Sequence, residues 1–71
     1  MTPAQLLELA DLRCQAQAAH LFYLRTAREY GVTAIYGTPI DEVIDDAARK
    51  LTDLQIDRSL ARTNAHHRST S

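Results

Sequence analysis

The positions of glycine and proline constrain this chain more than any other feature of its sequence. Its 71 residues include only two prolines, at positions 3 and 39, and two glycines, at positions 31 and 37. Because Gly and Pro interrupt helices more strongly than other residues, the chain divides into two long helix-permissive stretches joined by a short segment. We therefore predict an all-α fold, a two-helix antiparallel hairpin.

The first stretch carries a start signal and a stop signal for a single helix. Thr2 is a suitable cap, Pro3 fits the first helical position, and Gln5 is placed to complete a capping box. Gly31 provides the left-handed residue that commonly ends a helix. These signals predict a helix over residues 3–30, about 42 Å long.

A connector over residues 31–38 separates the two helices. It is apolar and β-branched, but we expect no sheet, because the segment is short and lacks partner strands. Thr38-Pro39 repeats the first start signal, and Asp41 and Glu42 place negative charge where the dipole of a second helix favours it.

The second helix is predicted over residues 39–62. Two acid-to-base pairs four residues apart support it, Asp45 with Arg49 and Asp46 with Lys50. The remaining residues, 63–71, are polar and without apolar periodicity, which predicts a disordered tail. The folded domain is thus predicted to span residues 1–62.

The apolar residues of the first helix form two arcs on a helical wheel, where one arc would be usual. The first arc contains Leu9, Leu12, Ala16, Ala19, Tyr23, Ala27 and Tyr30. The second contains Leu6, Leu7, Ala10, Cys14, Leu21 and Leu24. The second helix has one stripe, made of Ile40, Ile44, Ala47, Leu51 and Leu54, with Val43 and Leu60 beside it. One stripe covers one arc, so the other arc is predicted to be an interaction surface.

A second copy of the chain is the simplest cover for the remaining arc. Chains of this size bury only about 60% of their unfolded surface, and the lone Cys14 allows no internal disulfide. We therefore predict a homodimer, with two hairpins forming a four-helix bundle in which Ala16 and Ala19 allow close approach. The sequence leaves open which arc faces outward, so the predicted dimer interface draws on both: Leu9, Leu12, Ala16, Ala19, Leu21, Tyr23 and Leu24.

An alternative is a monomer that covers both arcs itself. The first helix would bend, or break near residues 15–17, or the connector would cover the remaining arc with Val32, Ile35 and Tyr36. The absence of Gly and Pro from residues 15–17 disfavours a break.

Charge is unevenly distributed although the net charge is only −1. The start of the second helix is acidic, with Asp41, Glu42, Asp45 and Asp46 as a predicted contact for a basic partner, such as the DNA-binding surface of a regulator. Dipole compensation and surface ion pairs are the alternative explanation of these acids. The basic residues of the chain end, Arg58, Arg62 and Arg68, make a weak electrostatic footprint, so nucleic-acid binding is not expected.

Aromatic residues gather near the connector. Tyr23 and Tyr30 share the first arc, which favours packing inside a bundle, whereas Phe22 and Tyr36 are predicted to point outward. Together with Ile35 and the acids of the second helix, Phe22 and Tyr36 form the predicted partner-binding surface.

No group of residues indicates catalysis, a metal or a cofactor. Cys14 and His20 lie on different parts of the first helix, and His66 and His67 lack the spacing of a helical metal pair. We therefore expect no enzyme and no cofactor. No apolar stretch approaches the roughly 20 residues needed to span a bilayer, so we expect a soluble, cytoplasmic protein.

These observations predict a small homodimeric helical interaction module that binds a larger protein and modulates or inhibits it. Small reading frames of phages and mobile elements offer an analogy of size and simplicity for such a regulator of a host factor. A small DNA-binding transcriptional regulator is the alternative. It is disfavoured because the connector is long and the second helix begins with acids instead of bases.

Overall fold

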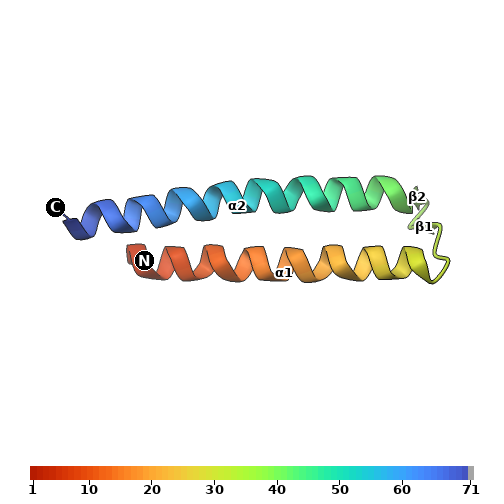
Figure 1. Ribbon diagram of the computed structural model, residues 1–71, viewed down its shortest axis with the longest axis horizontal. Coiled ribbons are helices and arrows are strands. Elements are labelled where there is room, and N and C mark those ends of the chain that lie inside the picture. Colours follow the sequence, from red (N-terminus) through yellow and green to blue (C-terminus); the bar gives the residue numbers. More distant parts are fainter. Residues whose placement is uncertain (71) are drawn as a thin grey trace.

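The chain folds as a long antiparallel helical hairpin. The structure, a computed structural model, describes the backbone of residues 1–70 and the side chains of residues 1–64. Helix α1 spans Pro3–Glu29 and helix α2 spans Ile40–Thr70, joined by two short strands, β1 (Ala34–Ile35) and β2 (Thr38–Pro39). The helices lie side by side in a rod of 53 × 17 × 14 Å (Figure 1). The predicted helical hairpin is confirmed.

Helix α1 begins with the predicted capping box. The Gln5 backbone N–H donates to the Thr2 hydroxyl at 3.1 Å, and the Thr2 backbone N–H donates to the Gln5 side-chain oxygen at 2.9 Å. Pro3 occupies the first turn, where its missing N–H leaves no helical bond unmade. The start of α1 is therefore fixed by the residues that the sequence identified.

Helix α1 ends in a glycine-dependent cap. Gly31 has a φ of 95°, a conformation that residues with a Cβ rarely adopt. The Val32 N–H then reaches the carbonyl of Ala27 at 3.0 Å, and the Gly31 N–H reaches that of Arg28 at 3.1 Å. This is the Schellman arrangement, which satisfies carbonyls at the helix end and turns the chain toward α2.

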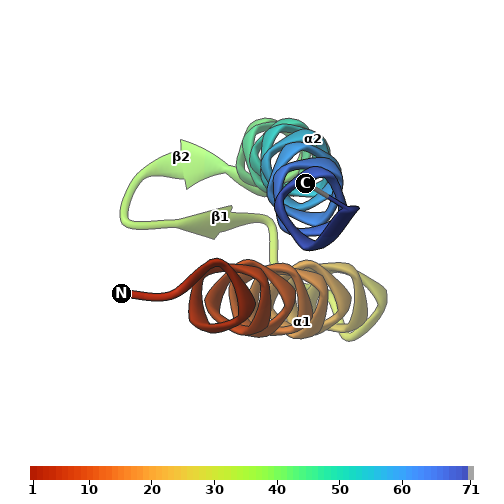
Figure 2. The same cartoon turned by 90° about the vertical axis from the view of Figure 1, so that its left-hand side faces the viewer.

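The connector forms a small β-hairpin, so the prediction that it contains no paired strands was wrong. The pairing is antiparallel, with Ala34 opposite Pro39 and Ile35 opposite Thr38. Tyr36 and Gly37 form the turn, both with positive φ, at 49° and 80°. Two positive φ angles match the turn type that suits two-residue hairpins, so the connector pairs with itself without a larger sheet. In Figure 2 this β-hairpin projects to one side of the helix pair.

Helix α2 begins one residue after the predicted start and extends past the predicted end at residue 62, through Thr70. Residues such as Ala61, Arg62 and Ala65 favour helix, and no Gly or Pro follows to stop it. The predicted disordered tail, residues 63–71, overlaps this helical segment. The side chains of residues 65–71 and the backbone of Ser71 lie outside the described residues.

The core lies in the half of the hairpin next to the connector. Its buried cluster consists of Leu21, Leu24, Ile40, Ile44 and Ala47, with Ile35, Val43, Ala48 and Leu51 packed against it. Leu24 is the most completely buried large side chain, with 1% of its surface exposed. Burying a side chain of this size contributes roughly 1.5–3 kcal/mol. The predicted apolar stripe of α2 is therefore the surface that closes the hairpin.

The second arc of α1, which contains Cys14, Leu21 and Leu24, faces α2. The first arc is left outside, because α1 runs without a break and the connector does not cover it. Val32 and Tyr36, which the monomeric alternative assigned to that cover, are themselves exposed. The described residues therefore contradict the self-covered monomer.

Candidate protein-interaction surface

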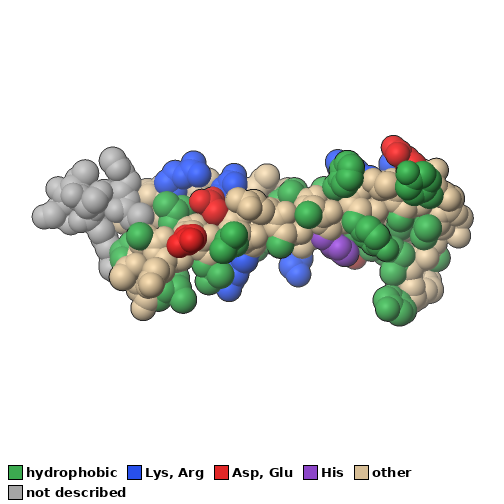
Figure 3. All heavy atoms as spheres, turned by 90° about the horizontal axis from the view of Figure 1, so that it is seen from below, with side chains coloured by type: hydrophobic (Ala, Val, Ile, Leu, Met, Phe, Trp, Pro, Cys, Tyr) green, Lys and Arg blue, Asp and Glu red, His purple; other side chains and the backbone are tan. Residues whose placement is uncertain are grey.

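A regular row of side chains runs along the outer face of α1. We call it the outward seam, and it consists of Leu9, Leu12, Ala16, Ala19, Tyr23 and Tyr30. Leu12 and Tyr30 are 54% and 85% exposed, and only Leu9 is half-buried. Figure 3 looks onto this side of the rod, where hydrophobic side chains recur along its length. This exposure agrees with the two-arc pattern, which predicted that α2 leaves one apolar face of α1 uncovered.

The outward seam has the spacing of a coiled-coil interface. Its members follow one another at intervals of three and four residues from Leu9 to Tyr23, and Tyr30 continues one heptad later. Thr26, which is half-buried, occupies the remaining position of that last heptad. Such a repeat keeps a stripe facing one partner helix over many turns.

The outward seam lies almost opposite the face of α1 that packs on α2. Leu12 precedes the buried Cys14 by two residues, and Tyr23 follows the buried Leu21 by two residues. Two residues of helix correspond to a rotation of about 200°, or 160° by the shorter way round. A partner on the outward seam therefore has room to bind without touching the contact between α1 and α2.

Two of the predicted interface residues belong to the other face. Leu21 and Leu24 are buried against α2 within one chain, so they are not available to a second copy. The sequence alone left open which arc is outside, and packing on α2 decides it. The remaining predicted interface residues, Leu9, Leu12, Ala16, Ala19 and Tyr23, all lie on the outward seam.

All four aromatic side chains of the chain are exposed. Phe22 and Tyr23 lie on α1, Tyr30 is the residue that caps its end, and Tyr36 is fully exposed in the turn of the β-hairpin. Tyr23 stacks on His20, with ring centroids 6.4 Å apart and the planes 15° from parallel. The predicted outward positions of Phe22 and Tyr36 agree with this exposure. Their role in partner binding stays a prediction.

Ile35 differs from Tyr36, its neighbour in the predicted partner-binding surface. Its side chain is half-buried and packs against the core cluster. Ile35 therefore anchors the β-hairpin to the helices, and Tyr36 is the residue that the hairpin presents to solvent.

The four acids at the start of α2 are exposed, but two of them are close to arginines. Asp41 accepts a hydrogen bond from Arg28 at 3.1 Å, a contact that joins the two helices. Among the described side chains, Asp46 lies 3.9 Å from Arg49, three residues along, in place of the predicted pairings at four-residue spacing. Glu42 and Asp45 complete the acidic surface. Exposed pairs of this kind contribute roughly 0–1 kcal/mol.

Two further contacts between the helices were not predicted. The Gln17 side-chain amide donates to the Ala47 carbonyl at 3.0 Å, reaching the backbone of α2 over a small side chain. Arg58, one of the bases near the chain end, lies 3.8 Å from Asp11. A helical wheel of one helix cannot predict either contact, because both contacts depend on how the two helices are aligned.

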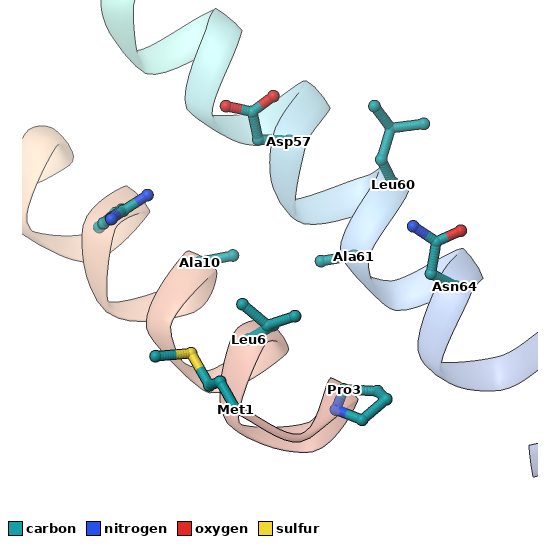
Figure 4. Close-up of a pocket in the computed structure, with 9 residues that line it drawn as sticks. Met1, Pro3, Leu6, Ala10, Asp57, Leu60, Ala61 and Asn64 are labelled. Carbon is teal, nitrogen blue, oxygen red and sulfur yellow. The ribbon is translucent and has the colours of Figure 1, made fainter. Parts of the chain in front are cut away.

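An open groove of about 560 Å³ lies between the helices at the end opposite the connector. Figure 4 shows Leu6 and Ala10 of α1 facing Ala61 of α2, with Met1 and Pro3 at the rim. Small alanines at the contact leave space that larger residues fill elsewhere in the hairpin. Sequence reasoning missed this groove. The signal that could have indicated it is the small size of Ala10 and Ala61, which lie where the two apolar stripes meet at this end.

Cysteine, histidine and acidic side chains do not cluster among the described residues. Cys14 is buried, His20 is exposed, and no group of three or more potential metal ligands comes together among the described side chains. Neither helix, over the residues searched, contains a segment long and apolar enough to cross a membrane. His66, His67 and Arg68 lie outside the described side chains.

Comparison of the chain with protein families, with curated proteins and with solved structures found no match.

Proposed function

We propose that this chain is a homodimeric protein-interaction module that binds a larger protein and modulates it. The observation that carries the proposal is the outward seam, a heptad row of apolar side chains on the face of α1 opposite α2. An apolar surface of this length on a small chain is characteristic of an interaction site.

A second copy is the partner that fits the outward seam best. The seam is a straight helical stripe, and an identical stripe offers matching spacing along its whole length. Ala16 and Ala19 at its middle let two helix backbones approach closely, while Leu12 and Tyr23 flank them with large apolar surfaces. The hairpin also has few buried apolar residues of its own, so further burial on pairing adds appreciable stability.

The larger protein is assigned to surfaces that pairing leaves free. These surfaces are Tyr36 on the β-hairpin and the acids of α2, of which Glu42 and Asp45 have no arginine within ion-pair distance among the described side chains. Phe22, predicted to bind the partner as well, lies on a flank of the outward seam, where a second copy approaches it. An aromatic anchor at the same end of the molecule as a set of acids suits a partner with an apolar pocket and a basic surface beside it. Modulation then follows from covering that partner's surface.

Light scattering and circular dichroism over a hundredfold dilution test the dimer. The wild-type chain is expected to be a helical dimer, and Leu12→Asp is expected to be a helical monomer, because a charge then interrupts the outward seam. Ile56→Asp is the matched control: Ile56 is an apolar residue with the same exposed fraction as Leu12, 54%, but it lies on α2. This control should stay dimeric.

Leu21→Asp serves as the contrasting variant, since Leu21 lies in the core. It is expected to unfold the hairpin, whereas Leu12→Asp is expected only to dissociate the dimer into folded monomers. A folded wild-type monomer at every concentration overturns the homodimer.

The binding of a larger protein is tested by affinity capture from the cells that produce the chain. Wild type is expected to retain one protein in a stoichiometric complex, and Tyr36→Ala is expected to lose it while remaining a dimer, because Tyr36 lies on the β-hairpin, away from the outward seam. Capture that is unchanged by Tyr36→Ala contradicts the assigned surface.

A further inference from the structure

Charged residues flank the outward seam differently on its two sides. One flank, at heptad spacing, contains Glu8, Gln15, Phe22 and Glu29, and the other contains Arg13, His20 and Ala27. Glu8 and Arg13 are exposed, and neither forms an ion pair among the described side chains. One flank therefore has an acid at each end, and the opposite flank has one arginine, Arg13.

The flanks of a two-stranded coiled coil meet differently in its two orientations. In a parallel pair, a residue on one flank faces the residue five positions later on the opposite flank of the partner. In an antiparallel pair, like flanks face each other. The orientation of a pair along the outward seam is therefore readable from its charges.

Parallel pairing brings opposite charges together. Glu8 of one copy faces Arg13 of the other, and the two-fold symmetry repeats this contact. The seam residues then meet their own counterparts, so that Ala16 and Ala19 meet alanines and Leu9 and Leu12 meet leucines. Every seam position from Leu9 to Tyr30 is covered in this register.

Antiparallel pairing is disfavoured in the registers that the seam allows. In one register Ala16 lies opposite Ala19 and Leu12 lies opposite Tyr23. Glu8 then faces Glu29, which puts two acids against each other, and Arg13 faces His20 and no acid. A shift by one heptad avoids that contact, but it leaves Leu9 beyond the partner helix in one direction and Tyr30 beyond it in the other, and Glu8 faces no opposite charge in either. Interfacial charges contribute little to affinity but they select orientation.

From these contacts we propose that two copies pair in parallel and in register along the outward seam, with both β-hairpins at the same end. The proposal rests on the homodimer of the proposed function and specifies its geometry. Because the outward seam lies about 160° from the face that packs on α2, the four helices form a row with the two α1 helices in the middle. This arrangement differs from the square four-helix bundle that the sequence predicts.

The parallel row creates a surface that neither copy has alone. Each β-hairpin projects sideways from its helix pair (Figure 2), and a two-fold axis along the helices places the two projections on opposite sides of the row. Tyr30 of each copy is the last residue of the outward seam, at the end where the two β-hairpins lie. One end of the dimer thus presents two copies of Tyr36 and of the acidic start of α2, which fits a two-fold symmetric partner with basic surfaces.

Disulfide trapping tests the orientation. The variants are made in a Cys14→Ala background, because each introduced cysteine is then the only thiol of its chain. Leu12→Cys and Tyr23→Cys are oxidised separately and as a refolded mixture, and products are identified by intact mass. Ile56→Cys is the control away from the seam. Circular dichroism and light scattering under reducing conditions establish that each variant is helical and dimeric before oxidation.

The parallel row predicts that Leu12→Cys and Tyr23→Cys each form a disulfide-linked homodimer and that Ile56→Cys does not. In the mixture only these two homodimers form, because the thiols introduced at positions 12 and 23 lie about 16 Å apart along parallel helices, beyond disulfide reach. A product that joins position 12 to position 23 establishes the antiparallel pair and overturns the proposal. Dimers in which no seam cysteine reacts also overturn it, whereas monomers under reducing conditions instead overturn the homodimer itself.

Discussion

The two ends of the hairpin are built differently although the same two helices run through both. Beside the connector, Leu21 and Leu24 pack against Ile40, Ile44 and Ala47 in a closed cluster. At the opposite end, Ala10 faces Ala61 across an open groove, and Leu6 and Leu60 remain exposed. A continuous pair of helices is therefore not a uniformly stable one.

Two physical factors favour the connector end. Its core residues are larger, so each contact removes more apolar surface from water. Its contacts also close short loops across the connector, and short loops lose less entropy on closure than long ones. The open end lacks both advantages and has only the Asp11–Arg58 ion pair as a polar contact between the helices among its described residues.

The largest expected difference between the two ends is in core truncation. Leu24→Ala should destabilise the chain by about 2–5 kcal/mol, because it leaves a cavity in the closed cluster. Leu6→Ala removes the same atoms from a residue that is 48% exposed, and it should cost less than about 1 kcal/mol. Urea denaturation followed by circular dichroism measures both. Equal losses would mean that the groove end is as tightly packed as the core.

Amide hydrogen exchange should show the same difference without mutation. Backbone amides of residues 21–27 and 43–51 are expected to exchange at least tenfold more slowly than those of residues 6–12 and 56–62, since opening is easiest where few apolar contacts hold the helices. Mass spectrometry of peptic fragments resolves these segments. Uniform protection along both helices would contradict the two-part description.

The sequence predicted what depends on neighbouring residues. Thr2, Pro3 and Gln5 define the start of α1, and Gly31 defines its end, because caps and breaks act within one or two turns. The stripe of α2 was equally readable, because it is the only apolar stripe on that helix.

Other features depend on how the helices are aligned, and these were missed or left open. Leu21 and Tyr23 are both apolar residues on α1, and only the path of the connector decides that Leu21 faces α2. The bond from Gln17 to the Ala47 carbonyl and the groove beside Ala61 follow from the same alignment. The pairing of the connector with itself was missed because Tyr36-Gly37 is an unusual turn sequence, with a bulky residue where Asn or Asp is favoured.

The β-hairpin turn offers a smaller test at the connector end. Tyr36→Asn should stabilise the chain by about 0.5–1 kcal/mol, because Asn adopts the positive φ of this position more readily than Tyr. Thermal unfolding by circular dichroism measures the gain. Tyr36→Val, with a β-branched side chain, should have the opposite effect, and a stabilising Val would exclude the turn geometry described above.

The smallest expected effects belong to the ion pairs, one at each end. Removing Arg28–Asp41 through Asp41→Asn, or Asp11–Arg58 through Asp11→Asn, should each cost less than about 1 kcal/mol. A double-mutant cycle in low and high salt isolates each pair energy. The shorter Arg28–Asp41 pair should give the larger coupling, and a larger coupling at the groove end would reverse the ranking of the two ends.

The rod shape determines how this chain behaves in hydrodynamic measurements. Its radius of gyration is 15.8 Å, whereas a compact domain of this length has about 11 Å, so a monomer already migrates as a larger globular protein would. Pairing side by side doubles the mass while leaving the longest dimension unchanged. Elution volume and end-over-end tumbling therefore change by less than the mass does, and methods that weigh the particle separate the two states more clearly than methods that size it.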